Sequence, residues 1–174
     1  MEIRPLDGGD GHALRDFLSD FERAGERRIP AFFADPGWSH EEIVQQFEAW
    51  ARGEGLEDGW VPSTTLFLID EGRILGVVNV RHRLNEHLMR EGGHVGYSVR
   101  PTCRNRGHGK RLLRGAMDQA GVLGIDRLLV TCDAGNAPSR HVIETCGGVL
   151  ENSVSCEGAA GEEDEPKHRF WIDL

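Results

Sequence analysis

The stretch from His94 to Met117 (HVGYSVRPTCRNRGHGKRLLRGAM) constrains the fold more than any other part of the chain. Val95, Tyr97 and Val99 alternate with smaller or polar residues, which predicts a strand that stops at Pro101. A glycine-containing turn follows, and after it apolar residues recur at the three- and four-residue spacing of an amphipathic helix. The order strand, glycine turn, helix indicates a ligand-binding site where the helix begins.

The turn itself reads Arg104-Asn105-Arg106-Gly107-His108-Gly109. The first amides of a helix have no intrahelical partner, and the helix dipole places partial positive charge there. Glycines at 107 and 109 remove side chains that would hold a phosphate away from those amides. Five basic residues add a local cationic field: Arg104, Arg106, Lys110, Arg111 and Arg114. The turn is therefore expected to bind a diphosphate.

Two common phosphate-binding motifs do not fit this turn. A Walker loop needs Gly-Lys followed by Ser or Thr, and Lys110 is followed by Arg111. A dinucleotide fingerprint needs a third glycine three residues after Gly109, and Leu112 stands there. A nucleotide-binding switch is therefore the least favoured hypothesis.

Composition limits the classes of protein that need to be considered. The 174 residues are expected to form one domain, 1–174, and no apolar run approaches the roughly 20 residues of a membrane helix. A formal net charge of −9 argues against nucleic-acid binding. The N-terminus lacks the layout of a signal peptide, so a cytoplasmic location is expected. The four cysteines form no C-x-x-C pair, so no metal site is expected.

The remaining segments predict a mixed α/β fold. Asp10 and Ser39 each offer a helix cap, and Glu42 completes a capping box with Ser39. The 126–133 segment should be a strand parallel to the 94–100 strand, because a helix connects the two. Segment 157–167, acidic and glycine-containing, is expected to be a loop. The other expected elements are strands 2–6, 64–70, 74–81, 149–156 and 168–174, and a short helix after residue 136.

The turn at 104–109 resembles the Arg/Gln-x-x-Gly-x-Gly/Ala pyrophosphate loop of the GNAT superfamily, the acyl-CoA-dependent N-acyltransferases. The order of elements resembles that superfamily over most of the chain, and the segment Thr131 to Gly148 resembles its second cofactor segment. His82 to Glu86 with Gly92 to Tyr97 most resembles a bacterial group of predicted acetyltransferases. The resemblance implies a mixed, mostly antiparallel central sheet, with a parallel splayed strand pair at its centre and about four flanking helices.

The resemblance also implies how acetyl-CoA would bind. Its pantetheine arm would lie between the splayed strands, bonded to backbone near Tyr97 and Val99. Its pyrophosphate would bind at Gly107 and Gly109, with Arg104 bracing the loop or touching phosphate. Asn136 would bond the pantetheine, although a plain helix cap is an equal alternative. The full set of implied cofactor residues is Tyr97, Val99, Arg104, Arg106, Gly107, His108, Gly109, Lys110, Asn136 and Ser139.

The implied reaction is acetyl transfer to a primary amine of a small-molecule acceptor by direct attack, without an acyl-enzyme. A backbone amide near Val99 would stabilise the oxyanion, by the same resemblance. Many relatives protonate the leaving thiolate with a tyrosine seven residues after the asparagine, and here that residue is Ile143. Glu86 is the first candidate for the base and His94 the second.

Other assignments stay open. Glu91 and Asp133 are further base candidates, and the acidic residues Glu157, Glu162, Glu163, Asp164 and Glu165 could attract a cationic amine. Because the usual tyrosine is missing, the main alternative is a non-catalytic CoA-binding regulatory or partner protein. The acceptor is unidentified, and a homodimer is possible.

Overall fold

Every strand pair of the central sheet is antiparallel except the pair at its middle, β4 and β5. The computed structural model describes residues 1–26, 29–35, 37–157 and 163–174. Seven strands lie in the order β1-β2-β3-β4-β5-β7-β6. This confirms the expected fold class. The strands are β1 (Glu2–Arg4), β2 (Ser63–Asp70), β3 (Arg73–Arg81), β4 (Val95–Val99), β5 (Arg127–Asp133), β6 (Val149–Glu157) and β7 (Glu163–Asp173).

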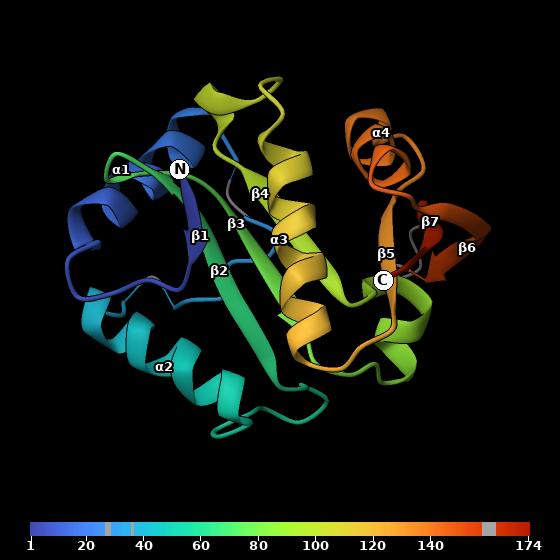
Figure 1. Cartoon of the computed structure of the whole chain (residues 1–174), viewed down its shortest axis with the longest axis horizontal. Helices are drawn as coiled ribbons and strands as arrows, with labels where there is room; N and C mark the ends of the chain where they lie inside the picture. Colours follow the sequence, from blue (N-terminus) through green and yellow to red (C-terminus); the bar gives the residue numbers. More distant parts are fainter. Residues whose placement is uncertain (27–28, 36, 158–162) are drawn as a thin grey trace.

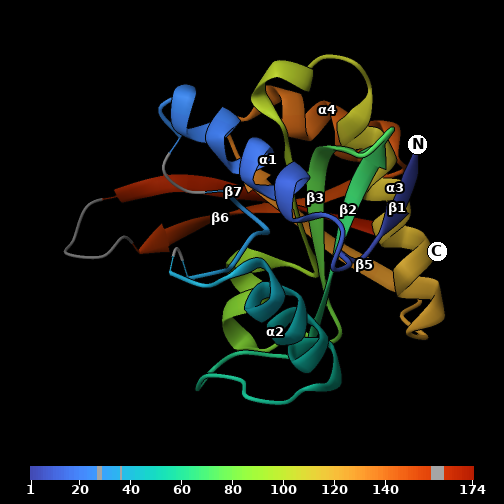
Figure 2. The same cartoon turned by 90° about the vertical axis from the view of Figure 1, so that its left-hand side faces the viewer.

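Helices cover both faces of the sheet (Figures 1 and 2). On one face lie α1 (Gly11–Arg23) and α2 (His40–Arg52), and on the other α3 (His108–Val122) and α4 (Ala137–Thr145). The alternation along β2 explains why both faces are needed. Leu66 and Leu68 pack into the core under α3, while Phe67 and Ile69 pack into the core under α1 and α2.

The two predicted helix caps have different outcomes. At α2 the capping box is confirmed, because Glu42 N donates to Ser39 Oγ at 3.3 Å and Ser39 N donates to Glu42 Oε2 at 2.7 Å. At α1 the predicted side-chain cap is wrong. The Asp10 carboxylate accepts hydrogen bonds of 2.6 and 2.9 Å from Arg4 instead, and thereby fastens β1 to the helix.

The described part of the acidic segment, Glu157 and 163–167, is strand, which corrects the expected loop there, and residues 158–162 lie outside the described residues. β6 continues to Glu157 and β7 begins at Glu163, and the two pair antiparallel. Glu163 to Glu165 lie at the start of β7, and the β5–β7 pairing ends at Lys167, so among the described strands only β6 flanks them. Glu165 Oε1 accepts a hydrogen bond from Gly135 N at the entrance to α4. Glu162 lies outside the described residues.

The interruption expected between β3 and β4 is a short helical turn, η1 (Leu88–Gly92). Leu88 is buried and ties the turn to the molecule. A second short turn, η2 (Pro101–Cys103), follows β4 and leads toward α3. Figure 1 shows η1 and η2 at opposite ends of β4, with the 101–107 segment beside the beginning of α3. A site at the glycine turn therefore lies at the opposite end of β4 from η1.

Candidate functional site

β4 and β5 separate almost as soon as they meet. The parallel ladder between them pairs only Val95 with Val130. Arg100 N donates to Leu75 O of β3, so alternate residues of β4 point their backbone groups toward β3. The intervening residues, Tyr97 and Val99, point theirs toward β5, where the ladder has ended. Backbone groups of this kind need partners, and an inserted chain molecule can supply them.

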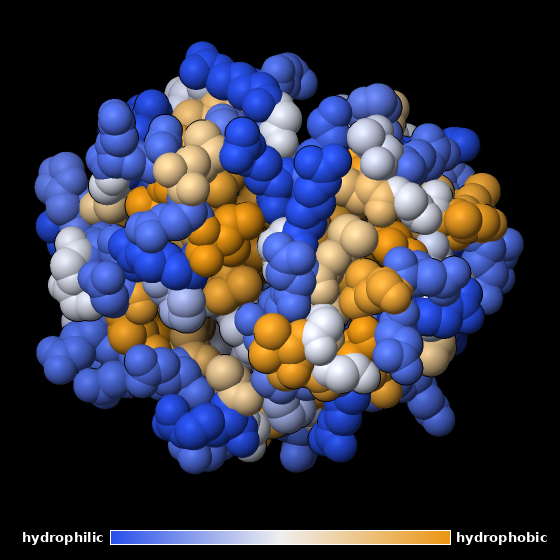
Figure 3. All heavy atoms as spheres, viewed as in Figure 1, coloured by the Kyte–Doolittle hydropathy of each residue, from blue (hydrophilic) through white to orange (hydrophobic). Residues whose placement is uncertain are grey.

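The separation opens into a cleft of about 740 Å³. In Figure 3 the surface is notched between the segment that precedes α3 and the α4 region. The cleft brings together nine of the ten residues expected to bind cofactor: Tyr97, Val99, Arg104, Gly107, His108, Gly109, Lys110, Asn136 and Ser139. Arg106 instead borders a neighbouring groove of about 560 Å³ between β1 and α3, which Gly107 and Lys110 also border.

Gly107 is required by backbone geometry. It is the N-cap of α3 with φ +81°, a conformation that side-chain-bearing residues rarely adopt. A Cβ built on Gly107 has no heavy atom within 4 Å, so the space beside it is open. Lys110 follows in the first turn and also lines the cleft. This is the arrangement expected of an anion-binding helix start.

Gly109 has a different role from the one expected. A Cβ at this position would lie 3.2 Å from Val142 Cγ2 and 3.6 Å from Tyr97 Cε2. The missing side chain therefore lets α3 approach α4 and β4 closely. Gly109 lines the cleft, but its bare Cα faces its neighbours in the fold.

Arg104 braces the loop, one of the two roles expected for it. Its guanidinium donates to both Glu26 carboxylate oxygens at 2.7 Å, and Nε donates to Val99 O at 3.3 Å. Glu26 accordingly has its pKa held below the ordinary value, chiefly by the hydrogen bond from Arg104. Glu26, Phe21 and Pro30 all line the cleft, and the sequence analysis did not find them. Their contacts lie about 70 to 80 residues away along the chain, so no local pattern signals them.

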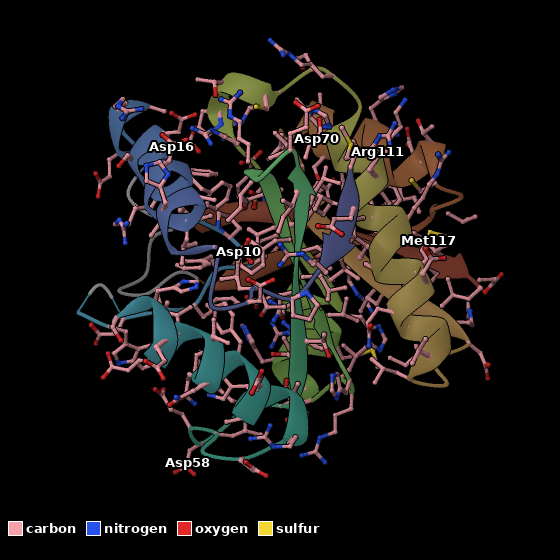
Figure 4. All side chains as sticks on the ribbon, turned by 60° about the vertical axis from the view of Figure 1, so that its left-hand side comes forward. Asp10, Asp16, Asp58, Asp70, Arg111 and Met117 are labelled. Atoms are coloured by element: carbon pink, nitrogen blue, oxygen red, sulfur yellow. The ribbon has the colours of Figure 1, made fainter. Side chains whose placement is uncertain are left out.

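His108 contributes a neutral polar group to the same wall. Its side chain is buried, and Nδ1 has no hydrogen-bond partner among the described residues. Burial lowers the pKa of His108, and the charges of Arg111 and Arg106 lower it further. Figure 4 shows Arg111 and Asp70 at the same end of the molecule, away from Asp58. Because Nδ1 is itself enclosed by the protein, the imidazole fits this place in its neutral form.

Asn136 caps the N-terminus of α4, which is one of the two roles predicted for it. Its Oδ1 accepts a hydrogen bond of 3.1 Å from Ser139 N. Its Nδ2 makes no hydrogen bond to the described part of the chain, so the amide keeps donors for a ligand in the cleft. The two predicted roles are compatible.

Tyr97 reaches across the cleft from β4 to α4. Its hydroxyl lies 2.9 Å from Ser139 Oγ and 3.4 Å from Ser139 O. Burial raises the pKa of Tyr97 to about 12, against a smaller opposing effect of the Ser139 hydrogen bond. The phenol therefore stays protonated at neutral pH. Ile143, at the position where the resemblance leads one to expect a tyrosine, is fully buried.

The two expected catalytic residues lie apart from the cleft lining. Glu86 is exposed next to η1, at the other end of β4 from the glycine turn, and forms no hydrogen bond or ion pair with described residues. His94 is buried, and Leu129 N donates to its Nδ1 at 2.9 Å. Burial and the nearby Arg81 charge lower the pKa of His94 to about 4. With Nδ1 engaged and a low pKa, the imidazole has a structural contact here.

The other base candidates also have partners in the fold. The backbone carbonyl of Glu91 accepts a hydrogen bond from Thr131 Oγ1, whereas no hydrogen bond or ion pair joins its carboxylate to the described residues. Asp133 forms an ion pair with Lys167 across the β5–β7 ladder. Across the described ranges, no three His, Cys, Asp or Glu side chains gather into a set that could hold a metal ion. None of the helices in those ranges is long and apolar enough to cross a membrane.

Comparison with known proteins gives one family and one fold. The family model described as the acetyltransferase (GNAT) domain matches residues 1–149. Solved structures of similar fold include a ribosomal-protein-alanine N-acetyltransferase from Brucella melitensis (20% identity, TM-score 0.68, covering 100% of both chains). They also include a GNAT-family acetyltransferase from Streptococcus pneumoniae (22% identity, TM-score 0.66, 99% of both chains). A proposed acetyltransferase from Salmonella typhimurium, determined with its cofactor acetyl-CoA, has 18% identity and a TM-score of 0.65, with 99% of this chain and 93% of that chain covered. No curated protein matches the chain.

Proposed function

The chain belongs to the GNAT acetyltransferase family, and from this premise we propose that it transfers the acetyl group of acetyl-CoA to a primary amine of a small-molecule acceptor. The observation that carries the proposal is the cleft itself. It joins an anion-binding helix start at Gly107 to the stretch of β4 at Tyr97 and Val99 that has left the ladder with β5. A diphosphate attached to an amide-bearing arm matches both parts of this surface.

Each part of acetyl-CoA has a proposed set of contacts. The pyrophosphate would bind the first amides of α3, with Lys110 as a cationic partner and His108 beside it in the cleft lining. The pantetheine amides would bond to the backbone of Tyr97 and Val99 and to the Asn136 side chain. Arg104 would hold the loop in place through Glu26. Acetyl-CoA is the cosubstrate in this proposal, and no metal takes part.

The chemistry needs no enzyme nucleophile. The neutral amine attacks the thioester carbonyl, and a backbone amide near Val99 stabilises the oxyanion. The oxyanion collapses, the carbon–sulfur bond breaks with its electrons going to sulfur, and the amine's surplus proton passes to water. The products are an amide and free coenzyme A.

The acceptor would approach β4 from the face that α1 and α2 cover. The segment after α1 lies directly on this part of β4. Ser98 Oγ donates to Pro30 O at 2.5 Å, and a Cβ built on Gly96 would lie 3.6 Å from the Ala31 side chain. This close cover leaves a narrow approach, which supports a small-molecule acceptor over a folded protein.

The assignment of a general base stays a prediction. Glu86 could act only through water from its exposed position, and His94 has its Nδ1 bonded to Leu129 N. The variant Glu86→Gln tests the first candidate directly. A rate within twofold of the wild-type rate at every pH would remove Glu86 from the mechanism.

The proposed activity is tested by following free thiol release from acetyl-CoA with a panel of small amines, polyamines, amino sugars and a peptide with a free N-terminus. We expect amine-dependent release with at least one small amine. Tight binding of coenzyme A without release for any amine would favour a non-catalytic CoA-binding regulator. The expected cytoplasmic location and the possible homodimer remain predictions, and size-exclusion chromatography measures the latter.

A further inference from the structure

Tyr97 is the only tyrosine of the chain, and it occupies a special place in the cleft. It begins on β4, its ring packs beside Gly109 of α3, and its hydroxyl meets Ser139 on the first turn of α4. It therefore contacts three elements that surround the cleft. Ile143, at the position of the usual thiolate partner, is an apolar side chain of the core.

The geometry of the cleft indicates which part of the cosubstrate would lie beside Tyr97. The lining extends from Gly107 and Lys110 at the helix start to Tyr97 on the strand. Two residues before Tyr97, Val95 pairs with Val130 and the strands close. A chain molecule anchored by its phosphates at Gly107, and inserted between the strands, thus ends near Tyr97. In acetyl-CoA that end is the thioester.

We propose that the Tyr97 hydroxyl, held by Ser139, donates a hydrogen bond to the coenzyme A sulfur and stabilises the thiolate as it leaves. The inference rests on the proposed acetyl transfer and assigns a catalytic residue to it. Ser139 Oγ can donate its own proton to the Tyr97 oxygen, since either atom of this pair can be the donor. The Tyr97 hydroxyl also donates to Ser139 O at 3.4 Å, a long contact that the phenolic proton would exchange for a hydrogen bond to the ligand.

Several other donors in the lining are engaged or lie elsewhere, while the Asn136 amide would bond the pantetheine. Ser98 Oγ donates to Pro30 O on the opposite face of β4. The Arg104 guanidinium is bound to both oxygens of Glu26. His108 and Lys110 lie at the helix start, where the phosphates would bind. The Tyr97 hydroxyl lies on the α4 side of β4, near the end of the cleft where the thioester would lie.

The proton stays on the tyrosine throughout. Burial holds the pKa of Tyr97 at about 12, whereas an ordinary thiol has a pKa of about 8.5. Transfer from phenol to thiolate would therefore be uphill by more than three pKa units. The carbon–sulfur bond breaks with both electrons going to sulfur, Tyr97 shares its proton through the hydrogen bond, and the thiolate takes its own proton from water on release. The phenol is thus a hydrogen-bond donor and not a general acid.

The experiment titrates the thiol of bound coenzyme A, which requires no acceptor. Thiolate absorption in the ultraviolet is followed against pH for coenzyme A with wild-type protein and with Tyr97→Phe. The protein alone is titrated in parallel to subtract its own groups, including Cys132 and Cys146, whose thiol pKa values burial raises. We expect the bound thiol to be about tenfold more acidic in the wild type than in the variant, the size of one hydrogen bond to a charged group.

Two serine variants keep the test decisive if Tyr97→Phe folds poorly. Ser139→Ala should raise the pKa of the bound thiol in the same direction by a smaller amount. Ser153→Ala is the matched control, because Ser153 Oγ bonds His168 on exposed strands outside the cleft, and it should change nothing. Once an acceptor is known, Tyr97→Phe should lower kcat about tenfold and leave the KM for acetyl-CoA within twofold.

The possible results separate the inference from the proposed function. Coenzyme A bound by wild type, Tyr97→Phe and Ser139→Ala with the same thiol pKa overturns the role of Tyr97 and leaves the function standing. A wild-type protein that binds no coenzyme A overturns the proposed function itself.

Discussion

Arg104 and Glu26, 78 residues apart, form a two-contact ion pair in the wall of the cleft, with both N···O distances at 2.7 Å. The pair fixes the first residue of the 104–109 turn to the segment just after α1. It is about half exposed, so its own contribution to stability is at most about 1 kcal/mol. Its larger effect is electrostatic, because it places a carboxylate beside the expected phosphates.

The first prediction concerns that carboxylate. Glu26→Gln removes a negative charge from the cleft, so coenzyme A should bind roughly two- to fivefold more tightly at low salt. The gain should shrink at high salt, because screening weakens the original repulsion. Isothermal titration calorimetry at two salt concentrations measures both effects. Weaker binding would mean that positioning of Arg104 by Glu26 outweighs the repulsion.

The second prediction compares the two glycines of the loop. Gly107→Ala should cost about 1 kcal/mol of stability through its positive φ, and should also weaken coenzyme A binding because the added methyl enters open cleft space. Gly109→Val should lower stability by crowding Val142 and Tyr97. Urea unfolding and calorimetry on each variant separate the effects. Equal coenzyme A affinity for Gly107→Ala and wild type would contradict the proposed phosphate site.

The third prediction concerns a buried ion pair that connects α1 to the end of β4. Arg100 is 2% exposed, and its Nε lies 2.5 Å from Asp20 Oδ2. Asp20→Asn should cost about 3 kcal/mol, since it leaves a buried cation with a weakened partner. Asp16 also contacts this guanidinium but is partly exposed, so Asp16→Asn is the matched control with a smaller loss.

The same ion pair gives a dependence of stability on pH. The hydrogen bond from Arg100 lowers the pKa of Asp20 to about 2 from its ordinary value of 3.8. The unfolded state therefore binds the proton first as pH falls. The stabilisation is complete above about pH 4 and is lost as pH falls toward 2. Between pH 4 and pH 2 the unfolding free energy of the wild type should fall more than that of Asp20→Asn. Equal losses in the two proteins, measured by urea unfolding at each pH, would contradict the assignment.

The fourth prediction separates a structural His94 from a catalytic one. His94→Asn keeps an acceptor near Leu129 N, whereas His94→Ala leaves that buried N–H unpaired and should cost about 2 kcal/mol. Since the pKa of His94 is about 4 when folded and about 6.5 when unfolded, its stabilising contribution is complete above pH 6.5 and fades as pH falls to 4. If His94→Asn abolished turnover while remaining folded, a catalytic role would be established.

Local patterns predicted what local physics determines. The capping box at Ser39 and Glu42, the glycine turn before α3 and the parallel placement of β5 all follow from short-range geometry or from connection rules. Nine of the ten expected cofactor residues reach the same cleft for that reason.

Side-chain contacts between residues far apart in the chain could not be predicted from the sequence. The sequence around Glu26 does not indicate that its carboxylate pairs with Arg104. The sequence around Asp10 does not indicate that its carboxylate binds Arg4 and not the first amides of α1. The acidic run after β6 appeared to be a loop because charged residues are rare in central strands. Its described residues begin β7 beyond the last β5 pair, where only β6 flanks them among the described strands, and this place removed the objection.

The single ladder contact between Val95 and Val130 has a consequence for the protein in the cell. Hydrogen bonding across the sheet is interrupted at its middle, so an inserted pantetheine arm would restore continuity between the two halves. A ligand that binds only the folded state at 100 times its Kd adds about 2.7 kcal/mol to the unfolding free energy. The melting temperature and the cellular half-life of this enzyme should therefore increase with the local concentration of acetyl-CoA.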